Sequence, residues 1–284
     1  MSDSSRPSTD SINNSKLDTH KLGHAIELNN RKLNMNELNI NSDFLKVFYT
    51  NARSIRNKFE ELVGYLYMHN VDVACISESW VSETHYKDNI EAYKINGYNL
   101  YLFQRSRAGG GVALYIKDKF YTTDLKHSLM KRNVESVWVE ITIHKKTIRL
   151  GLIYRAPNSE ETYNNDLLEE MKDMASIKTP LLILGDFNFP DINWVTKLGN
   201  NVNSNKLVET INDLFLEQLV NTPTREISNN ILDLILTHSP EIVQNINVLE
   251  SLGNSDHNII MFNITMNKND VNNNIKVPNF NRGD

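Results

Sequence analysis

The sequence has very little cysteine: Cys75 is the only one among 284 residues. A single thiol excludes an intramolecular disulfide and a zinc site built from several cysteines. Cys75 lies in the apolar run 71–76, which favours a buried, inert thiol over a nucleophile.

Long apolar runs are also missing. No segment approaches the roughly 18 apolar residues that span a bilayer, and the N-terminus, MSDSSRP, lacks the apolar core of a signal peptide. We therefore expect an intracellular protein in a reducing compartment. The Asn-x-Ser/Thr sequences at Asn13 and Asn263 then predict no glycosylation.

A basic excess is absent too, since the formal net charge is −5. This counts mildly against a general nucleic-acid binder, which usually carries excess Lys and Arg. It is not decisive, because carboxylates gathered around a metal ion are neutralised locally by that ion.

What is present suffices for a core: 40% of the residues are hydrophobic and 8% are aromatic. The length fits one large α/β domain or two small ones. Residues 1–43 are rich in Ser, Asn and Asp and predict a disordered polar leader, and the Asn-rich residues 267–284 predict a disordered tail that starts a linker. Residues 44–266 contain neither linker nor repeat, which predicts one domain.

Within 44–266, apolar runs that predict strands alternate with amphipathic runs that predict helices. Ser54 is the expected N-cap of a helix over 57–69. The stripe of Leu207, Ile211, Leu214, Phe215 and Leu219 predicts a helix over 206–219, and a third is expected over 160–175. The expected strands cover 44–50, 72–76, 98–103, 111–117, 135–144, 147–154, 180–184, 232–236, 242–249 and 258–264. Two sheets stacked face to face with helices outside would bury this many strands, which predicts an α/β sandwich.

The segment 180–188, PLLILGDFN, is the most informative. Its continuous apolar run predicts a strand buried on both faces. Asp186 and Asn188 follow at i and i+2, so in an extended chain their side chains point the same way. Catalytic groups of α/β proteins gather beyond the carboxyl ends of strands. The alternative is a strand that stops at Gly-Asp with Asn188 capping the turn, and this segment alone leaves both open.

Polar residues that burial would not select also lie at the end of other predicted strands or just beyond them, and Asp256 immediately precedes the last strand. These residues are Asn51, Glu78, Tyr154, Arg155, Asn158 and Asp256. Each has an ordinary explanation, such as a strand terminus, a solvated loop acid, a core aromatic with a wet hydroxyl, or a turn. Asp233 is different, because a carboxylate inside the apolar run ILDLIL needs a buried partner. His257 is the candidate, since an Asp–His pair orients the ring and raises its basicity.

Taken together, these residues predict a chemistry. Glu78, Asp186, Asp256 and Asn51 offer hard oxygen ligands, while a thiolate and a nucleophilic serine elbow are both missing. Oxygen ligands without sulfur suit Mg²⁺ or Mn²⁺. The set therefore favours metal-assisted hydrolysis of a phosphate ester.

Six motifs, TNARS, ISESW, IYRAPN, GDFN, LDLIL and SDHNII, occur in this order. In that order they resemble the endonuclease/exonuclease/phosphatase superfamily, which includes abasic-site repair nucleases and deoxyribonuclease I-like enzymes. The longer words NARSIRNK, GGGVALYIK, ESVWVEI, LGDFNFPDINW and NTPTREISNNILDLILTH look like the endonuclease domain of LINE-type non-LTR retrotransposons, over roughly 45–264. The resemblance implies a deoxyribonuclease I-like, four-layer α/β sandwich of two packed mixed sheets flanked by helices.

The resemblance also implies how the acidic residues act. Glu78 matches the main metal ligand, and Asn51 lies beside the metal and its waters. Asp186 matches the residue that positions and deprotonates the attacking water, which Asn188 helps to hold. Asp256 completes the acidic cluster and assists a metal or the leaving group. The resemblance leaves one metal and two metals equally open.

Further matches concern the phosphate. Tyr154 corresponds to the tyrosine that contacts the scissile phosphate, and His257, paired with Asp233, stabilises the charge developing on a non-bridging oxygen. Candidates for contacts with phosphate or DNA are Arg155, Arg53 and Asn158, and Arg56, Lys58, Arg105 and Arg107 are candidates to line a basic groove. Ordinary solvated surface charges are the alternative for each arginine and lysine.

The implied reaction is a Mg²⁺-dependent or Mn²⁺-dependent nick in one strand of double-stranded DNA that leaves a 3′-hydroxyl primer. A reverse transcriptase domain in a longer parent polyprotein is an expected partner, and a nuclear monomer without membrane contact is the expected state. Two alternatives stay open: a phosphoesterase of the same superfamily acting on abasic sites, inositol phosphates or lipid phosphodiesters, and a non-catalytic relic that binds DNA.

Overall fold

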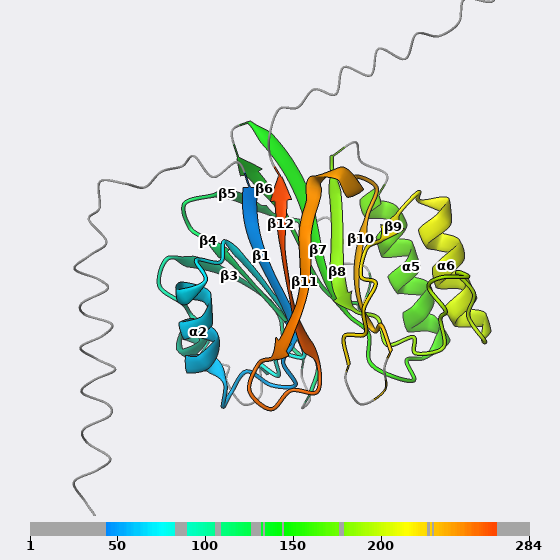
Figure 1. The fold of residues 1–284 in the computed structure, drawn as a ribbon, viewed down its shortest axis with the longest axis horizontal. Helices are drawn as coiled ribbons and strands as arrows, with labels where there is room; N and C mark the ends of the chain where they lie inside the picture. Colours follow the sequence, from blue (N-terminus) through cyan, green and yellow to red (C-terminus); the bar gives the residue numbers. More distant parts are fainter. Residues whose placement is uncertain are drawn as a thin grey trace, which may run out of the picture. The chain divides into compact units, whose positions relative to one another are not determined.

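The computed structural model describes residues 44–82, 90–105, 109–125, 132, 134–143, 145–175, 179–225, 228 and 230–265. These residues fold into two six-stranded sheets with helices outside them (Figure 1). The predicted leader and tail lie outside the described residues, so their disorder stays a prediction. Among the described helices, none combines the length and the hydropathy needed to cross a membrane.

The first sheet contains one parallel pair at its centre, β1 with β2, and its other pairs are antiparallel. In the order of their pairing, its strands are β11 (Val243–Ser251), β12 (Asn258–Thr265), β1 (Phe44–Asn51), β2 (Val73–Ser77), β4 (Val112–Lys117) and β3 (Tyr98–Phe103). The predicted pairing of β3 with β4 is confirmed.

The second sheet has the same plan, with β7 and β8 as its parallel pair. Its strands, again in pairing order, are β5 (Tyr121–Asp124), β6 (Glu135–Ile143), β7 (Lys146–Tyr154), β8 (Leu181–Asp186), β10 (Asp233–Thr237) and β9 (Glu217–Gln218). The predicted β6–β7 hairpin is confirmed, and Lys145 in its turn has φ +68°. The short strands β5 and β9 were not predicted.

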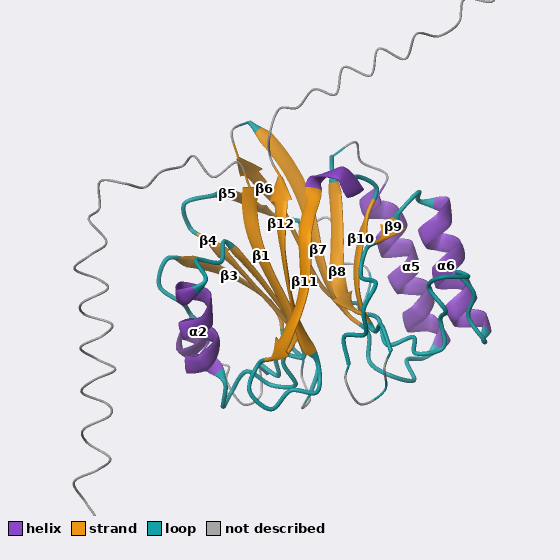
Figure 2. Ribbon diagram, in the orientation of Figure 1, coloured by secondary structure: helices purple, strands orange, loops and turns teal. Residues whose placement is uncertain are grey.

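Helices cover the outer faces of both sheets (Figure 2). Leu62 and Leu66 of α2 (Phe59–Met68) pack against the outward side chains of the first sheet. The helices α5 (Glu161–Ala175) and α6 (Val202–Asp213) pack against the second sheet. Two 3₁₀ turns, η1 (Ile90–Tyr93) and η2 (Pro240–Ile242), join strands. The predicted four-layer sandwich of two mixed sheets is confirmed.

The predicted capping role of Ser54 is wrong. The helix α2 begins at Phe59 after Lys58, whose side chain makes no capping hydrogen bond. Ser54 lies upstream with φ +88°, and its Oγ accepts from the amide of Arg56 at 3.3 Å. A serine in a tight turn offers the same hydrogen bond as a serine at a cap, so the residue type alone did not distinguish them.

The predicted helix over 206–219 begins earlier and ends earlier than expected. Asn201 caps α6, because its Oδ1 accepts from the amides of Asn203 and Ser204, both at 3.0 Å. The chain leaves the helix at Leu214, and Phe215 has φ +53° and is 85% exposed. The apolar stripe therefore continued past the helix into the loop before β9.

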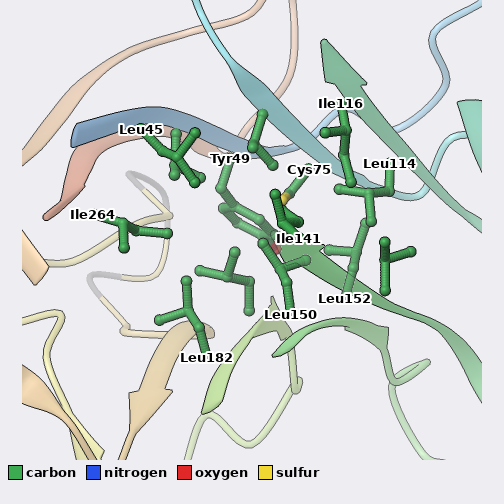
Figure 3. Packing of buried hydrophobic residues seen from close by; sticks show 14 of the residues in the cluster. Leu45, Tyr49, Cys75, Leu114, Ile116, Ile141, Leu150, Leu152, Leu182 and Ile264 are labelled. Atoms are coloured by element: carbon green, nitrogen blue, oxygen red, sulfur yellow. The ribbon is translucent and has the colours of Figure 1, made fainter. Parts of the chain in front are cut away.

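The core between the sheets is built by strict alternation. Leu45, Val47 and Tyr49 of β1 face the second sheet, while Phe48 faces α2. Figure 3 shows Tyr49 and Cys75 among the aliphatic side chains of this layer. The prediction of a buried thiol is confirmed, and burial raises the pKa of Cys75 far above its usual value.

The same alternation places polar side chains at one edge of the layer. Continuing each inward row by one step beyond its last apolar residue reaches Asn51 on β1, Ser77 on β2, Tyr154 on β7 and Asp186 on β8. Because β10 runs antiparallel to β8, its first residue, Asp233, lies at this edge and pairs with Asp186. The topology thus gathers the polar strand ends between the two sheets.

Candidate active site

Asn51 joins the two sheets at this edge. Its Nδ2 donates to Glu78 Oε1 at 3.0 Å and to Asp186 Oδ2 at 2.8 Å. The backbone amide of Arg53 donates to Asn51 Oδ1 at 3.0 Å and so fixes the orientation of the carboxamide. One fully buried amide therefore holds two carboxylates from different sheets.

Glu78 follows β2 and remains partly accessible. Its second carboxylate oxygen, Oε2, accepts from Trp80 Nε1 at 3.0 Å. Positive φ angles occur at Glu78 (+48°) and Trp80 (+56°), and Arg53 on the neighbouring loop has +43°. Such strained backbone clusters at functional sites, where the surrounding structure stabilises it.

Asp186 is fully buried and accepts three hydrogen bonds. Besides Asn51, the backbone amide of Asn188 donates to its Oδ1 at 3.0 Å, and Asn188 Nδ2 donates to its Oδ2 at 3.0 Å. The two residues meet as expected, but for another reason: Asn188 has φ +51°, so the chain turns back instead of extending. Burial and the charge of Asp233 raise the pKa of Asp186 well above its usual value, which makes its carboxylate a stronger base.

Asp233 and His257 form the predicted pair. His257 Nδ1 lies 2.8 Å from Asp233 Oδ2, and since a carboxylate only accepts, Nδ1 carries the proton. The other oxygen, Oδ1, accepts from Tyr49 Oη at 2.6 Å. Tyr49, Asp233 and His257 are all buried. The carboxylate therefore has a donor on each side, and the imidazole ring is fixed.

The charge of His257 follows from this arrangement. Burial alone would lower the pKa of His257, but the Asp233 carboxylate outweighs it and raises the pKa to about 9. At neutral pH the ring is therefore protonated and can donate from both nitrogens. We call Asp186, Asp233 and His257 the inner site, because they offer ligand atoms within 4.8 Å of one another.

The inner site itself is a poor fit for a metal ion, although its spacing would allow one. An ion there would displace the hydrogen bonds that Asp233 accepts from Tyr49 and His257. The Glu78 side fits better, because Glu78 is partly accessible and its carboxylate lies near that of Asp186, both held by Asn51 Nδ2. These are hard donors without sulfur, as Mg²⁺ prefers.

Tyr154 ends β7 and is buried. Burial, together with the carboxylates of Glu78 and Asp186, raises its pKa far above the usual range. The phenol therefore keeps its proton and can act as a hydrogen-bond donor.

Arg155 and Asn158, which follow Tyr154 and were predicted to contact phosphate or DNA, differ from each other in burial. Arg155 is buried: its Nε donates to Asn164 Oδ1 at 2.7 Å, Nη1 donates to the carbonyls of Phe187 and Asn188, and its guanidinium lies 3.8 Å from the centre of the Phe189 ring. These contacts position the turn after β8. Asn158 is exposed with φ +56°. Phosphate binding by either residue stays a prediction.

Asp256 lies between two arginines. Its Oδ1 forms an ion pair with Arg53 Nη1 at 3.1 Å, and its Oδ2 accepts a hydrogen bond from Arg225 Nε and forms an ion pair with Arg225 Nη2, both at 2.8 Å. Burial would raise the pKa of Asp256, but these hydrogen bonds hold it below its usual value. The carboxylate thus remains ionised and is already neutralised by the protein.

Sequence reasoning missed four residues of this region: Tyr49, Trp80, Thr224 and Arg225. Tyr49 had a usable signal, since it lies two positions before Asn51 on an alternating strand. The other three lie in loops, where no periodicity indicates which side chains turn inward.

Comparison with known proteins agrees with the motifs. The family described as "Endonuclease-reverse transcriptase" matches residues 148–261, a segment that contains Tyr154, Asp186, Asp233 and His257. No curated protein matches the chain significantly in sequence. The resemblance to the endonuclease/exonuclease/phosphatase superfamily is confirmed.

Solved structures share the fold. The endonuclease domain of TRAS1, a telomere-specific non-LTR retrotransposon, has a TM-score of 0.62 at 19% identity and covers 79% of this chain and 100% of its own. AP endonuclease LMAP from Leishmania major has 0.64 at 12%, covering 78% and 88%. The 3′ phosphatase NExo from Neisseria, bound to a product DNA hairpin, has 0.59 at 15%, covering 78% and 99%. These three structures are two endonucleases and a 3′ phosphatase, and the likeness shows that this chain shares their fold.

Proposed function

We propose that this chain is a divalent-metal-dependent DNA endonuclease of the retrotransposon type, which hydrolyses a phosphodiester of target DNA and leaves a 3′-hydroxyl primer. One observation carries the proposal above all: Asp186, whose pKa is raised, lies beside the protonated Asp233–His257 pair at the joint end of the two sheets. Hydrolysis of a phosphodiester needs two groups from a protein: a base that takes a proton from water, and a fixed, positively charged hydrogen-bond donor for the phosphate oxygens.

The proposed base is Asp186. Asn51 and Asn188 aim its carboxylate, and the proton of the attacking water passes to it as the new oxygen–phosphorus bond forms. The bond from phosphorus to the 3′ oxygen breaks in the same displacement, and the departing 3′ oxygen takes a proton from solvent water, which leaves a 3′-hydroxyl and a 5′-phosphate.

The donors act on the phosphate oxygens. His257 offers its Nε2–H while Asp233 and Tyr49 hold the ring in place. The phenol of Tyr154 is a second donor, because it keeps its proton. Donors that are fixed before the reaction stabilise the negative charge that develops in the transition state without reorganising.

A divalent cation, Mg²⁺ or Mn²⁺, belongs to the proposal. Glu78 would hold it, with Asp186 adjacent and with Asn51, whose Nδ2 donates to both carboxylates, beside it. When bound, the ion would supply Lewis-acid polarisation of the phosphate and partial neutralisation of the acidic residues. The fit rests on the chemistry of the donor atoms, which are oxygens. The single cysteine, Cys75, is buried in the core and therefore offers no thiolate to the site.

The expected partners extend the proposal. Double-stranded DNA is the substrate, a reverse transcriptase domain in a longer parent polyprotein would extend the primer, and the protein would act as a monomer in the nucleus. The likeness to an endonuclease domain of a retrotransposon and to a phosphatase bound to a DNA hairpin supports DNA as the substrate.

A second function is supported by the likeness to AP endonuclease LMAP, which is as close in fold. It would use the same residues on abasic DNA. Three substrates separate the functions: a supercoiled plasmid, a duplex with one abasic site, and a soluble phosphomonoester, each with Mg²⁺ and with EDTA. We expect Mg²⁺-dependent nicking of the intact plasmid. Cleavage confined to the abasic duplex would establish the second function, and DNA binding without any cleavage would overturn both.

A further inference from the structure

Asp256 and its two arginines form a separate feature beside the inner site, which we call the arginine rim. Arg53 comes from the loop after β1, Arg225 from the segment between β9 and β10, and Asp256 from the turn before β12. The side chains of the arginines are 51% and 35% exposed, whereas that of Asp256 is only 10% exposed. A nearly buried carboxylate therefore holds two cations that reach the solvent.

Backbone contacts tie the rim to the inner site. The amide of Arg53 holds the carboxamide of Asn51, and Arg225 pairs with His257 in an isolated antiparallel bridge. The backbone of each arginine therefore directly contacts a residue of the candidate active site, Asn51 for Arg53 and His257 for Arg225. If a DNA strand placed one phosphate at the inner site, the two arginines would lie close to that phosphate and to the next phosphates of the strand.

Thr224 strengthens this connection. Its Oγ1 accepts from the amide of Asp233 at 3.3 Å, and its carbonyl accepts from the amide of Asn258 at 2.8 Å. The dipeptide Thr224-Arg225 therefore supports the Asp233–His257 pair with one residue and presents a guanidinium with the next. The backbone of Arg225 therefore supports His257, whereas its side chain extends to Asp256.

The charges show why such a rim is useful. Glu78, Asp186 and Asp233 would repel an incoming polyanion before any cation neutralises them. A guanidinium has five N–H donors, and Asp256 accepts a hydrogen bond from Arg225 Nε and forms ion pairs with Nη2 of Arg225 and Nη1 of Arg53. Each arginine therefore keeps donors for a second anion, and guanidinium binds phosphate through paired, charge-assisted hydrogen bonds.

We propose that Arg53 and Arg225 form a phosphate-binding pair that engages the DNA backbone beside the scissile bond, with Asp256 as the clamp that positions both. The inference rests on the proposed function for its substrate. It also gives Asp256 a role other than metal binding, because both of its carboxylate oxygens already pair with guanidinium groups.

DNA binding tests the pair without requiring catalysis. Fluorescence anisotropy with a short labelled duplex in EDTA would give the Kd between about 50 and about 200 mM KCl. Because each lost phosphate contact removes about 0.9 from the slope of log Kd against log salt, we expect about one unit less for Arg53→Ala and for Arg225→Ala, and about two units less for the double variant.

Arg132→Ala is the matched control, since Arg132 also pairs with one aspartate, Asp173 of α5. Its slope should equal that of the wild type. Arg225→Lys keeps the charge but loses the paired donors, so it should retain the slope and bind more weakly. Near-native circular dichroism of Arg53→Ala, whose side chain is half exposed, would keep the test valid even if Arg225→Ala failed to fold.

Each outcome has a defined meaning. Slopes of Arg53→Ala and Arg225→Ala equal to those of the wild type and of Arg132→Ala would overturn the phosphate pair while leaving the proposed function intact. Reduced slopes in a protein that never cuts DNA with Mg²⁺ or Mn²⁺ would keep the pair and overturn the endonuclease.

Discussion

The inner site and the arginine rim each depend on one aspartate, and the two aspartates have opposite surroundings. Asp233 is fully buried and holds Tyr49 and His257, two groups that do not reach the solvent. Asp256 is nearly buried but holds two arginines whose side chains reach the solvent. The buried carboxylate fixes and charges an imidazole ring, whereas the rim carboxylate sets the direction of two guanidinium groups. Under the proposed function, the inner site would perform the chemistry and the arginine rim would bind the substrate.

The largest effect should come from Asp233→Asn. The carboxamide preserves the shape but removes the charge that holds the proton on His257, so we expect the nicking rate to fall about 10³-fold to 10⁴-fold. The Kd for DNA in EDTA should stay within about twofold, because the rim is unchanged. A rate near that of the wild type would remove Asp233 from the mechanism.

The stability should depend on pH through His257. Its pKa is raised from 6.5 to about 9, so its contribution is fully present below pH 6.5 and is lost as the pH rises through 9. Urea unfolding of wild type and His257→Asn at about pH 6 and about pH 10 should show the difference in unfolding free energy shrink by on the order of 3 kcal/mol. A difference that is constant with pH would contradict the raised pKa.

Metal binding should distinguish Glu78, which lies beside the inner site, from the arginine rim by about tenfold. Glu78→Gln removes a proposed ligand and should weaken Mn²⁺ binding about tenfold or more in an isothermal titration. Asp256→Asn should change it by less than about twofold, since its carboxylate serves the arginines. Equal losses in both variants would restore Asp256 as a metal ligand.

The smallest effect should be on the stability of the rim. The ion pair of Arg53 is half exposed, and such pairs contribute less than about 1 kcal/mol. Urea unfolding of Arg53→Ala should therefore give a loss below about 1 kcal/mol, although its affinity for DNA falls. A much larger loss would show that Arg53 braces the fold.

Much of the fold could be predicted from the sequence because the central strands of both sheets, such as β2 and β8, are buried on both faces. The strands then appear as continuous apolar runs, as in 181–184, and their number requires two sheets. Element ends were harder to predict. The Asn201 cap begins α6 through local hydrogen bonds, and the left-handed Phe215 follows its end. An apolar stripe records neither of these features.

For the site, the sequence identified residues that burial does not explain, such as Asp233, and the structure brings them together with Asp186 and His257. It could not show Arg225, because an arginine in a loop is most often solvated. Nor could it show that Glu78 adopts a positive φ, which depends on tertiary contacts instead of residue type.

Single-turnover nicking of a supercoiled plasmid with Mg²⁺ and saturating protein tests the separation of chemistry from binding most directly. With every plasmid bound, we predict that His257→Ala loses at least about 10² in rate constant. Arg53→Ala and Arg225→Ala should stay within about threefold of the wild type and need only more protein to saturate. The opposite order, or a wild type that does not nick DNA with Mg²⁺, would contradict the account.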